Sequence, residues 1–92
     1  MTAADETNGN RIEGGAARAV LEHVARAIVG EPDALVVRVE ERRGAVTLFL
    51  HAAPDDLGRL IGRRGRVAQA LRTVVRAAGT RDGVVAAVEI EE

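Results

Sequence analysis

Two glycines three positions apart, Gly62 and Gly65, join two segments of helical character with only Arg63 and Arg64 between them. A connection this short forces a sharp turn, and glycine at each end accepts backbone angles that a Cβ would forbid. The helix that begins near Arg66 directs unpaired N–H groups and the positive end of its dipole toward the same loop. The loop is therefore suited to hold a phosphate group, although a tight helix–helix turn explains the two glycines equally well.

The periodicity of the apolar residues predicts three helices and three strands. Apolar residues recur at helical spacing in three segments, 16–29, 54–61 and 66–78. They alternate with a period of two in three others, 35–40, 46–51 and 84–90. Arg43-Gly44 is typical of a tight hairpin turn, and Gly79 is interpreted as the residue that ends the last helix. The predicted order is α-β-β-α-α-β.

This order predicts an α+β fold, with a three-stranded mixed sheet and three helices packed on one of its faces. The second and third helices form a long connection between the last two strands, which allows these strands to lie parallel. In the last helix, one stripe of apolar residues is expected to face the core. Its members are Val67, Ala70, Leu71, Val74 and Ala78.

The length of 92 residues is that of one domain. Residues 1–13 are polar and acidic and lack periodicity, so a disordered tail is expected there, with a folded domain over 14–92. No apolar run approaches the roughly 20 residues that span a bilayer. The chain has no cysteine, which favours a reducing cytoplasm.

Charge is distributed unevenly along the chain. All thirteen basic residues are arginines, and seven of them lie between Leu57 and Arg81, a stretch without any acidic residue. One concentrated basic segment in a nearly neutral chain indicates a polyanionic partner. The absence of lysine and cysteine and the two isolated histidines disfavour a nucleotide loop, a metal site or covalent catalysis. We therefore expect no enzyme activity, no cofactor and no small-molecule substrate.

The segment Leu60-Ile61-Gly62-Arg63-Arg64-Gly65-Arg66-Val67 resembles the signature of the KH domain, an apolar pair followed by GxxG and a further apolar residue. The order of elements is similar to the type II KH topology. The stretch from Ala53 to Arg66 is similar to the KhpA family, the small single-domain KH proteins of bacteria. The resemblance extends from about Ala16 to Glu92.

This resemblance implies that the chain binds single-stranded RNA, with the GxxG loop clamping the backbone of about four nucleotides. By position, the loop residues are Gly62, Arg63, Arg64 and Gly65, and the flanking basic residues are Arg59, Arg66 and Arg72. The groove for the bases is assigned to Ile61, Val67, Ala68 and Leu71, with one unidentified residue of a sheet edge. Without Tyr or Trp to stack on the bases, we expect weak and permissive binding.

The resemblance also implies a homodimer, or a heterodimer with a larger KH protein of the Jag (KhpB) type. Post-transcriptional regulation or RNA chaperoning would be its role. Two other readings of the residues stay open. A protein-interaction adaptor would use the same fold with little RNA binding, and charge reversal at Arg63 and Arg64 separates the two. A helix-hairpin-helix DNA binder also uses a glycine loop, but it would lack the predicted strands.

Overall fold

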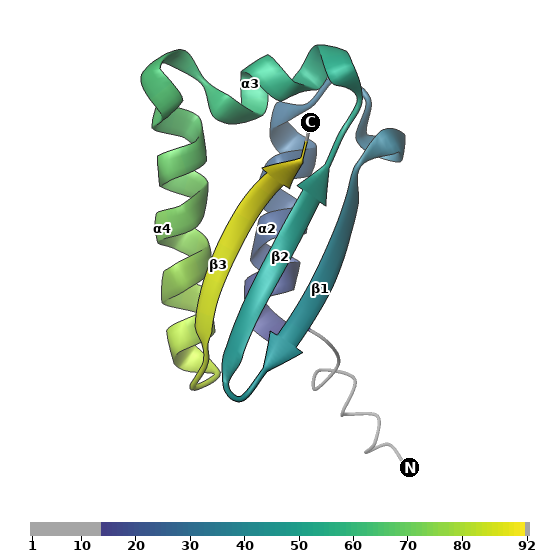
Figure 1. Ribbon diagram of the computed structural model, residues 1–92. Helices are drawn as coiled ribbons and strands as arrows, with labels where there is room; N and C mark the ends of the chain where they lie inside the picture. The colour runs from purple at the N-terminus through teal and green to yellow at the C-terminus, as the bar shows by residue number, and fades with distance from the viewer. Residues whose placement is uncertain (1–13, 92) are drawn as a thin grey trace.

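The computed structural model describes residues 14–91, so the disordered tail expected over 1–13 lies outside the described residues. The elements in chain order are α2 (Gly15–Ile28), β1 (Val36–Arg42), β2 (Ala45–His51), α3 (Leu57–Ile61), α4 (Arg66–Arg81) and β3 (Val85–Glu91). Short 3-10 turns occupy Pro32–Ala34, Pro54–Asp56 and Arg63–Gly65. The predicted α-β-β-α-α-β order is confirmed (Figure 1). None of the helices described could cross a membrane, because none combines the length and the apolar character required.

The sheet is mixed, as predicted, and its strand order is β1-β2-β3. β1 and β2 pair antiparallel through the Arg43-Gly44 turn, where both residues have positive φ angles of 46° and 84°. Positive φ at both central residues is the mark of the type I′ hairpin turn, whose twist matches that of the strands. β3 pairs parallel to β2 after the crossover through α3 and α4.

The helices cover one face of the sheet, and the core lies between the two layers (Figure 1). Alternate residues of the strands point toward the helices, as the period of two predicts. The most buried large side chains of this core are Leu21, Leu48, Leu50, Leu60 and Val75. The central strand β2 therefore supplies the middle of the core, and Leu60 anchors α3 in this core.

The buried stripe of α4 differs from the predicted one. Ala70 is exposed and Val74 is 44% exposed, whereas Ala68 and Val75 are buried in their place. Gly79 does not end the helix, which continues to Arg81. A Cβ on Gly79 would lie 2.8 Å from Cβ of Ala86, so this glycine allows β3 to approach α4 closely.

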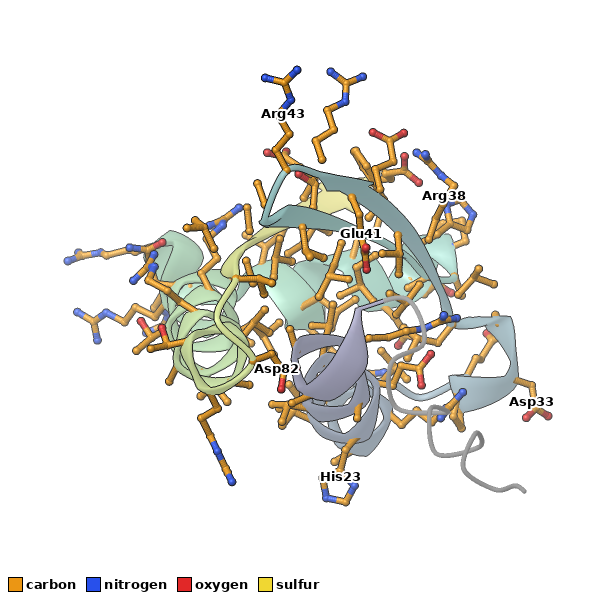
Figure 2. The ribbon with its side chains drawn as sticks, turned by 90° about the horizontal axis from the view of Figure 1, so that it is seen from below. His23, Asp33, Arg38, Glu41, Arg43 and Asp82 are labelled. Carbon is orange, nitrogen blue, oxygen red and sulfur yellow. The ribbon has the colours of Figure 1, made fainter. Side chains whose placement is uncertain are left out.

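Two carboxylates from distant parts of the chain accept hydrogen bonds at the start of α2. The Gly14 N–H donates to Oε2 of Glu41 at 3.1 Å, and the Ala16 N–H donates to Oδ2 of Asp82 at 2.8 Å. Figure 2 labels both acids on either side of this helix end. Negative charge near a helix N-terminus is favourable, so these contacts fix α2 to β1 and to the turn before β3.

Candidate nucleic-acid interface

The loop between α3 and α4 is a tight turn with an unusual backbone. Gly62 has φ 75° and ψ 170°, and the next two positive φ angles belong to Arg64 (57°) and Gly65 (72°). The Gly65 N–H donates to the carbonyl of Gly62 at 3.1 Å, and the Gly62 N–H donates to that of Gly58 at 2.8 Å. The loop backbone is thus bonded to itself and to α3, which gives it a defined shape.

The two positions of the loop require glycine for different structural reasons. A Cβ on Gly62 would lie 2.4 Å from Cγ2 of Val67 and 2.9 Å from the Val67 backbone nitrogen. A Cβ on Gly65 would meet nothing within 4 Å. Gly62 is therefore required by close packing against the first turn of α4, whereas Gly65 is required only by its left-handed backbone conformation.

The start of α4 is open to an anion. No side chain caps this end, so its first N–H groups have no side-chain acceptor. Arg63, Arg64 and Arg66 surround it and are exposed. Within residues 14–91, none of these three side chains takes part in an ion pair or a side-chain hydrogen bond. The Arg66 N–H donates to the carbonyl of Arg63. Three available guanidinium groups and the positive end of the α4 dipole lie together here, an arrangement that favours an anion.

The other two arginines predicted to flank the RNA have partners within the domain. Nη1 of Arg59 lies 2.8 Å from Oδ1 of Asp56. Nε of Arg72 donates to the carbonyl of Val88 in β3 at 3.3 Å. The structure thus groups Arg66 with the loop arginines and gives Arg59 and Arg72 structural contacts. Contact of either side chain with RNA stays a prediction.

Asp56 is a structural residue that no sequence motif revealed. Its side chain is 1% exposed and accepts hydrogen bonds from the N–H groups of Gly30 (2.9 Å) and Glu31 (3.1 Å), besides its contact with Arg59. The hydrogen bond from Gly30 is the main cause that lowers the pKa of Asp56, against the opposing effect of burial. Asp56 thereby fixes the segment after α2 to the start of α3, which carries the loop.

The residues assigned to the base groove divide into two pairs. Ile61 is 37% exposed and Val67 is partly buried, so both present apolar surface beside the loop. Ala68 and Leu71 are buried and offer little surface to a base. The sheet edge next to α4 is β3, so β3 is the strand expected to supply the sheet-edge residue of the groove (Figure 1). The groove assignment itself stays a prediction.

The open face of the sheet has less unpaired positive charge and aromatic surface for a nucleic acid than the loop end has. Its aromatic residue, Phe49, lies under the guanidinium of Arg38, 4.1 Å from the ring centroid. Arg38 in turn contacts Glu40 at 2.9 Å and Glu91 at 3.0 Å, so its charge is balanced by two acids. Among residues 14–91, no three His, Asp or Glu side chains are grouped so that they could hold a metal ion. The loop end is therefore the better candidate site.

The α-β-β-α-α-β order, the mixed sheet and the GxxG turn between two helices define a KH domain of type II. A family model described as "KhpA/KhpB, KH domain" matches residues 18–90. The chain is 45% identical over 71 residues to RNA-binding protein KhpA of Streptomyces coelicolor, which covers 77% of this chain and 90% of that protein. It is 38% identical over 71 residues to RNA-binding protein KhpA of Caldanaerobacter subterraneus subsp. tengcongensis, covering 77% and 95%.

A third relative, RNA-binding protein KhpA of Mycobacterium tuberculosis, is 48% identical over 61 residues, or 66% of this chain and 76% of that protein. The chain belongs to the KhpA family, as its GxxG segment predicted. Membership in this family of KH-domain proteins also confirms the prediction of a non-enzymatic chain.

Proposed function

We propose that this protein binds single-stranded RNA through its GxxG loop, with Arg63, Arg64 and Arg66 contacting phosphates and Ile61 and Val67 contacting bases. The observation that carries the proposal is the start of α4, where no side chain caps the helix and three exposed guanidinium groups have no partner within residues 14–91. The name RNA-binding protein given to its relatives agrees with it. Binding is expected to be weak for one domain, because no Tyr or Trp is present to stack on bases.

In this proposal the protein acts in the cytoplasm as a post-transcriptional regulator or RNA chaperone, alone or paired with a KhpB-type partner. The family model, which covers both KhpA and KhpB domains, supports a relation between the two kinds of protein. Pairing two weak RNA sites raises the overall affinity through the effective concentration of the second site. A dimer would therefore compensate for the weak binding of each domain.

The proposed function is tested by fluorescence anisotropy of a labelled RNA of mixed sequence, measured as a single strand and as the matched duplex. With about three phosphate contacts, the affinity for the single strand is expected to fall roughly tenfold to twentyfold between about 50 and 200 mM salt. The duplex is expected to bind more weakly, because its paired bases cannot enter the groove. A protein that binds neither form would support the adaptor alternative instead.

For the homodimer, we propose an interface on the outer face of α4. Val74 is exposed there, and the exposed Ala70 and Ala77 lie one helical turn before and after it. Small apolar side chains at this spacing allow two helices to approach closely.

Val74→Asp is expected to convert the dimer to a monomer without unfolding the domain, because the side chain is already 44% exposed. Sedimentation velocity at several protein concentrations measures the change. Val85→Asp is the matched control, since Val85 is also an exposed valine but lies on the open sheet face, with 71% exposure. If the wild type dimerises and only Val85→Asp disrupts the dimer, the interface is on the sheet and not on α4.

A further inference from the structure

The outer edge of β1 is open to another strand. β1 pairs with β2 alone, because the strand order of the sheet is β1-β2-β3. Arg42 and Ala45 flank the two-residue hairpin turn and bond to each other, so every second residue of β1 before Arg42 also faces β2. The residues between them, Val37, Val39 and Glu41, therefore direct their backbone groups to the free edge. Unpaired backbone groups along a sheet edge are a template for pairing with another chain.

Little of the domain covers this edge. Among the residues that the structure describes, one side chain reaches these backbone groups: Nη2 of Arg18 donates to the carbonyl of Val37 at 3.4 Å. A carbonyl has two lone pairs, so the Val37 carbonyl can accept a hydrogen bond from a strand N–H as well. The edge can therefore accept an extended segment along its whole length.

The charges along β1 favour a second copy of the same strand as that segment. In an antiparallel pair of two β1 strands centred on Val39, all seven residues from Val36 to Arg42 find a partner. Arg38 of each copy then lies opposite Glu40 of the other. A register centred on Arg38 or on Glu40 would instead place like charges opposite each other, which is unfavourable. Any shifted register also leaves one end of the strand unpaired.

The two charge pairs would form one network around the two-fold axis. Within one chain, Nη1 of Arg38 lies 2.9 Å from Oε2 of Glu40, and both side chains are more than half exposed. Arg38 also contacts Glu91 at 3.0 Å. A guanidinium has five N–H donors, so Arg38 can bond to a further carboxylate while it keeps these contacts. Charges of alternating sign would thus surround the axis, and such a network contributes more than an isolated surface ion pair.

We propose that β1 is a self-association surface, through which two copies of the chain pair antiparallel about Val39. Each copy contributes the three strands of its sheet, and the two-fold symmetry makes the contact identical for both. This surface is separate from the α4 interface proposed above, because α4 packs beside β3 at the opposite edge of the sheet (Figure 1). The two interfaces can therefore form independently of each other.

Single cysteines test the register, because the chain has no cysteine of its own. Val39→Cys places the two cysteines of a pair directly opposite, with Cα atoms about 5.5 Å apart, a separation that a disulfide allows. Val36→Cys is the matched control on the same strand. Val36 is the more exposed of the two valines, but its two copies would lie at opposite ends of the paired strands, roughly 20 Å apart.

Both cysteine variants also carry Val74→Asp, so that contacts through α4 do not bring the chains together. Mild oxidation followed by non-reducing electrophoresis measures the rate at which covalent dimers form. Val39→Cys is expected to form them at least roughly tenfold faster than Val36→Cys, because pairing raises the effective concentration of its thiol. Equal rates, a faster Val36→Cys, or no dimer from either variant would overturn the proposed pairing.

Charge variants test the same register without a cysteine. Arg38→Glu places like charges in both pairs and is expected to weaken self-association through β1 roughly tenfold. Arg38→Glu/Glu40→Arg restores opposite charges in the same register and should restore association. Sedimentation equilibrium in the Val74→Asp background measures the association, and thermal melts establish that each variant is folded. If the double variant associates as weakly as Arg38→Glu, the two strands do not pair about Val39.

Discussion

Gly62→Ala is expected to abolish RNA binding and to lower the free energy of unfolding by about 2–3 kcal/mol. With φ 75° and ψ 170°, Gly62 occupies a backbone region that is almost exclusive to glycine. The added Cβ would also lie 2.4 Å from Cγ2 of Val67, so the loop and the first turn of α4 must separate. That movement would displace the N–H groups and arginines proposed to hold the phosphate.

Gly65→Ala is the matched control within the same loop. Gly65 has φ 72° and ψ 15°, a left-handed conformation that alanine adopts at a cost of about 1–2 kcal/mol, and the space around its missing Cβ is empty. We expect a smaller loss of stability and RNA affinity within a few-fold of the wild type. Thermal melts and anisotropy of both variants measure these effects. Equal losses in the two variants would contradict the packing role assigned to Gly62.

Asp56→Asn is expected to lower the melting temperature by roughly 5–15 °C at neutral pH. The buried carboxylate accepts three hydrogen bonds with its two oxygens, from Gly30, Glu31 and Arg59. Asparagine is nearly the same size, but its amide nitrogen is a hydrogen-bond donor. In place of a carboxylate oxygen it would face an N–H donor of Gly30, Glu31 or Arg59. The substitution therefore leaves buried N–H groups unpaired and loosens the connection between α2 and α3.

The pKa of Asp56, lowered chiefly by the hydrogen bond from Gly30, predicts how this loss depends on pH. A group with a lowered pKa in the folded state contributes its full stability above its unfolded pKa, about 3.9 for Asp. That contribution is lost as the pH falls through the folded-state pKa. The difference in melting temperature between wild type and Asp56→Asn should therefore be constant at pH 5–7 and shrink below about pH 4. If the difference in melting temperature stays constant well below pH 4, Asp56 is not ionised in the folded protein.

Local signals in the sequence predicted the order of the elements and the position of the loop. The period of two, the Arg43-Gly44 turn and the GxxG spacing each depend on residues a few positions apart, and all three appear in the structure. The buried side of α4 was harder to predict, because alanines at many positions leave a broad apolar arc. Only contact with the sheet decides that Val75 is buried and Val74 exposed.

The contacts that the sequence did not predict join residues far apart in the chain. Glycine is typical of a helix end, yet Gly79 lies inside α4, where β3 packs closely against it. Asp56 and Arg59 form a pair one helical turn apart, but the N–H groups that complete their site belong to Gly30 and Glu31. The contact of Arg72 with Val88 likewise depends on how α4 lies against β3. No periodicity or motif carries this information.

The most direct test of the RNA site is the single-stranded RNA affinity of Arg63→Asp/Arg64→Asp beside that of Arg76→Asp/Arg81→Asp. Both variants reverse two exposed arginines and change the net charge equally, but only the first alters the loop. Melting temperatures should barely change in either variant. We expect the loop variant to lose binding at least tenfold more than the control, with a weaker dependence on salt. Equal losses would mean that RNA responds only to net charge and that the GxxG loop is not its site.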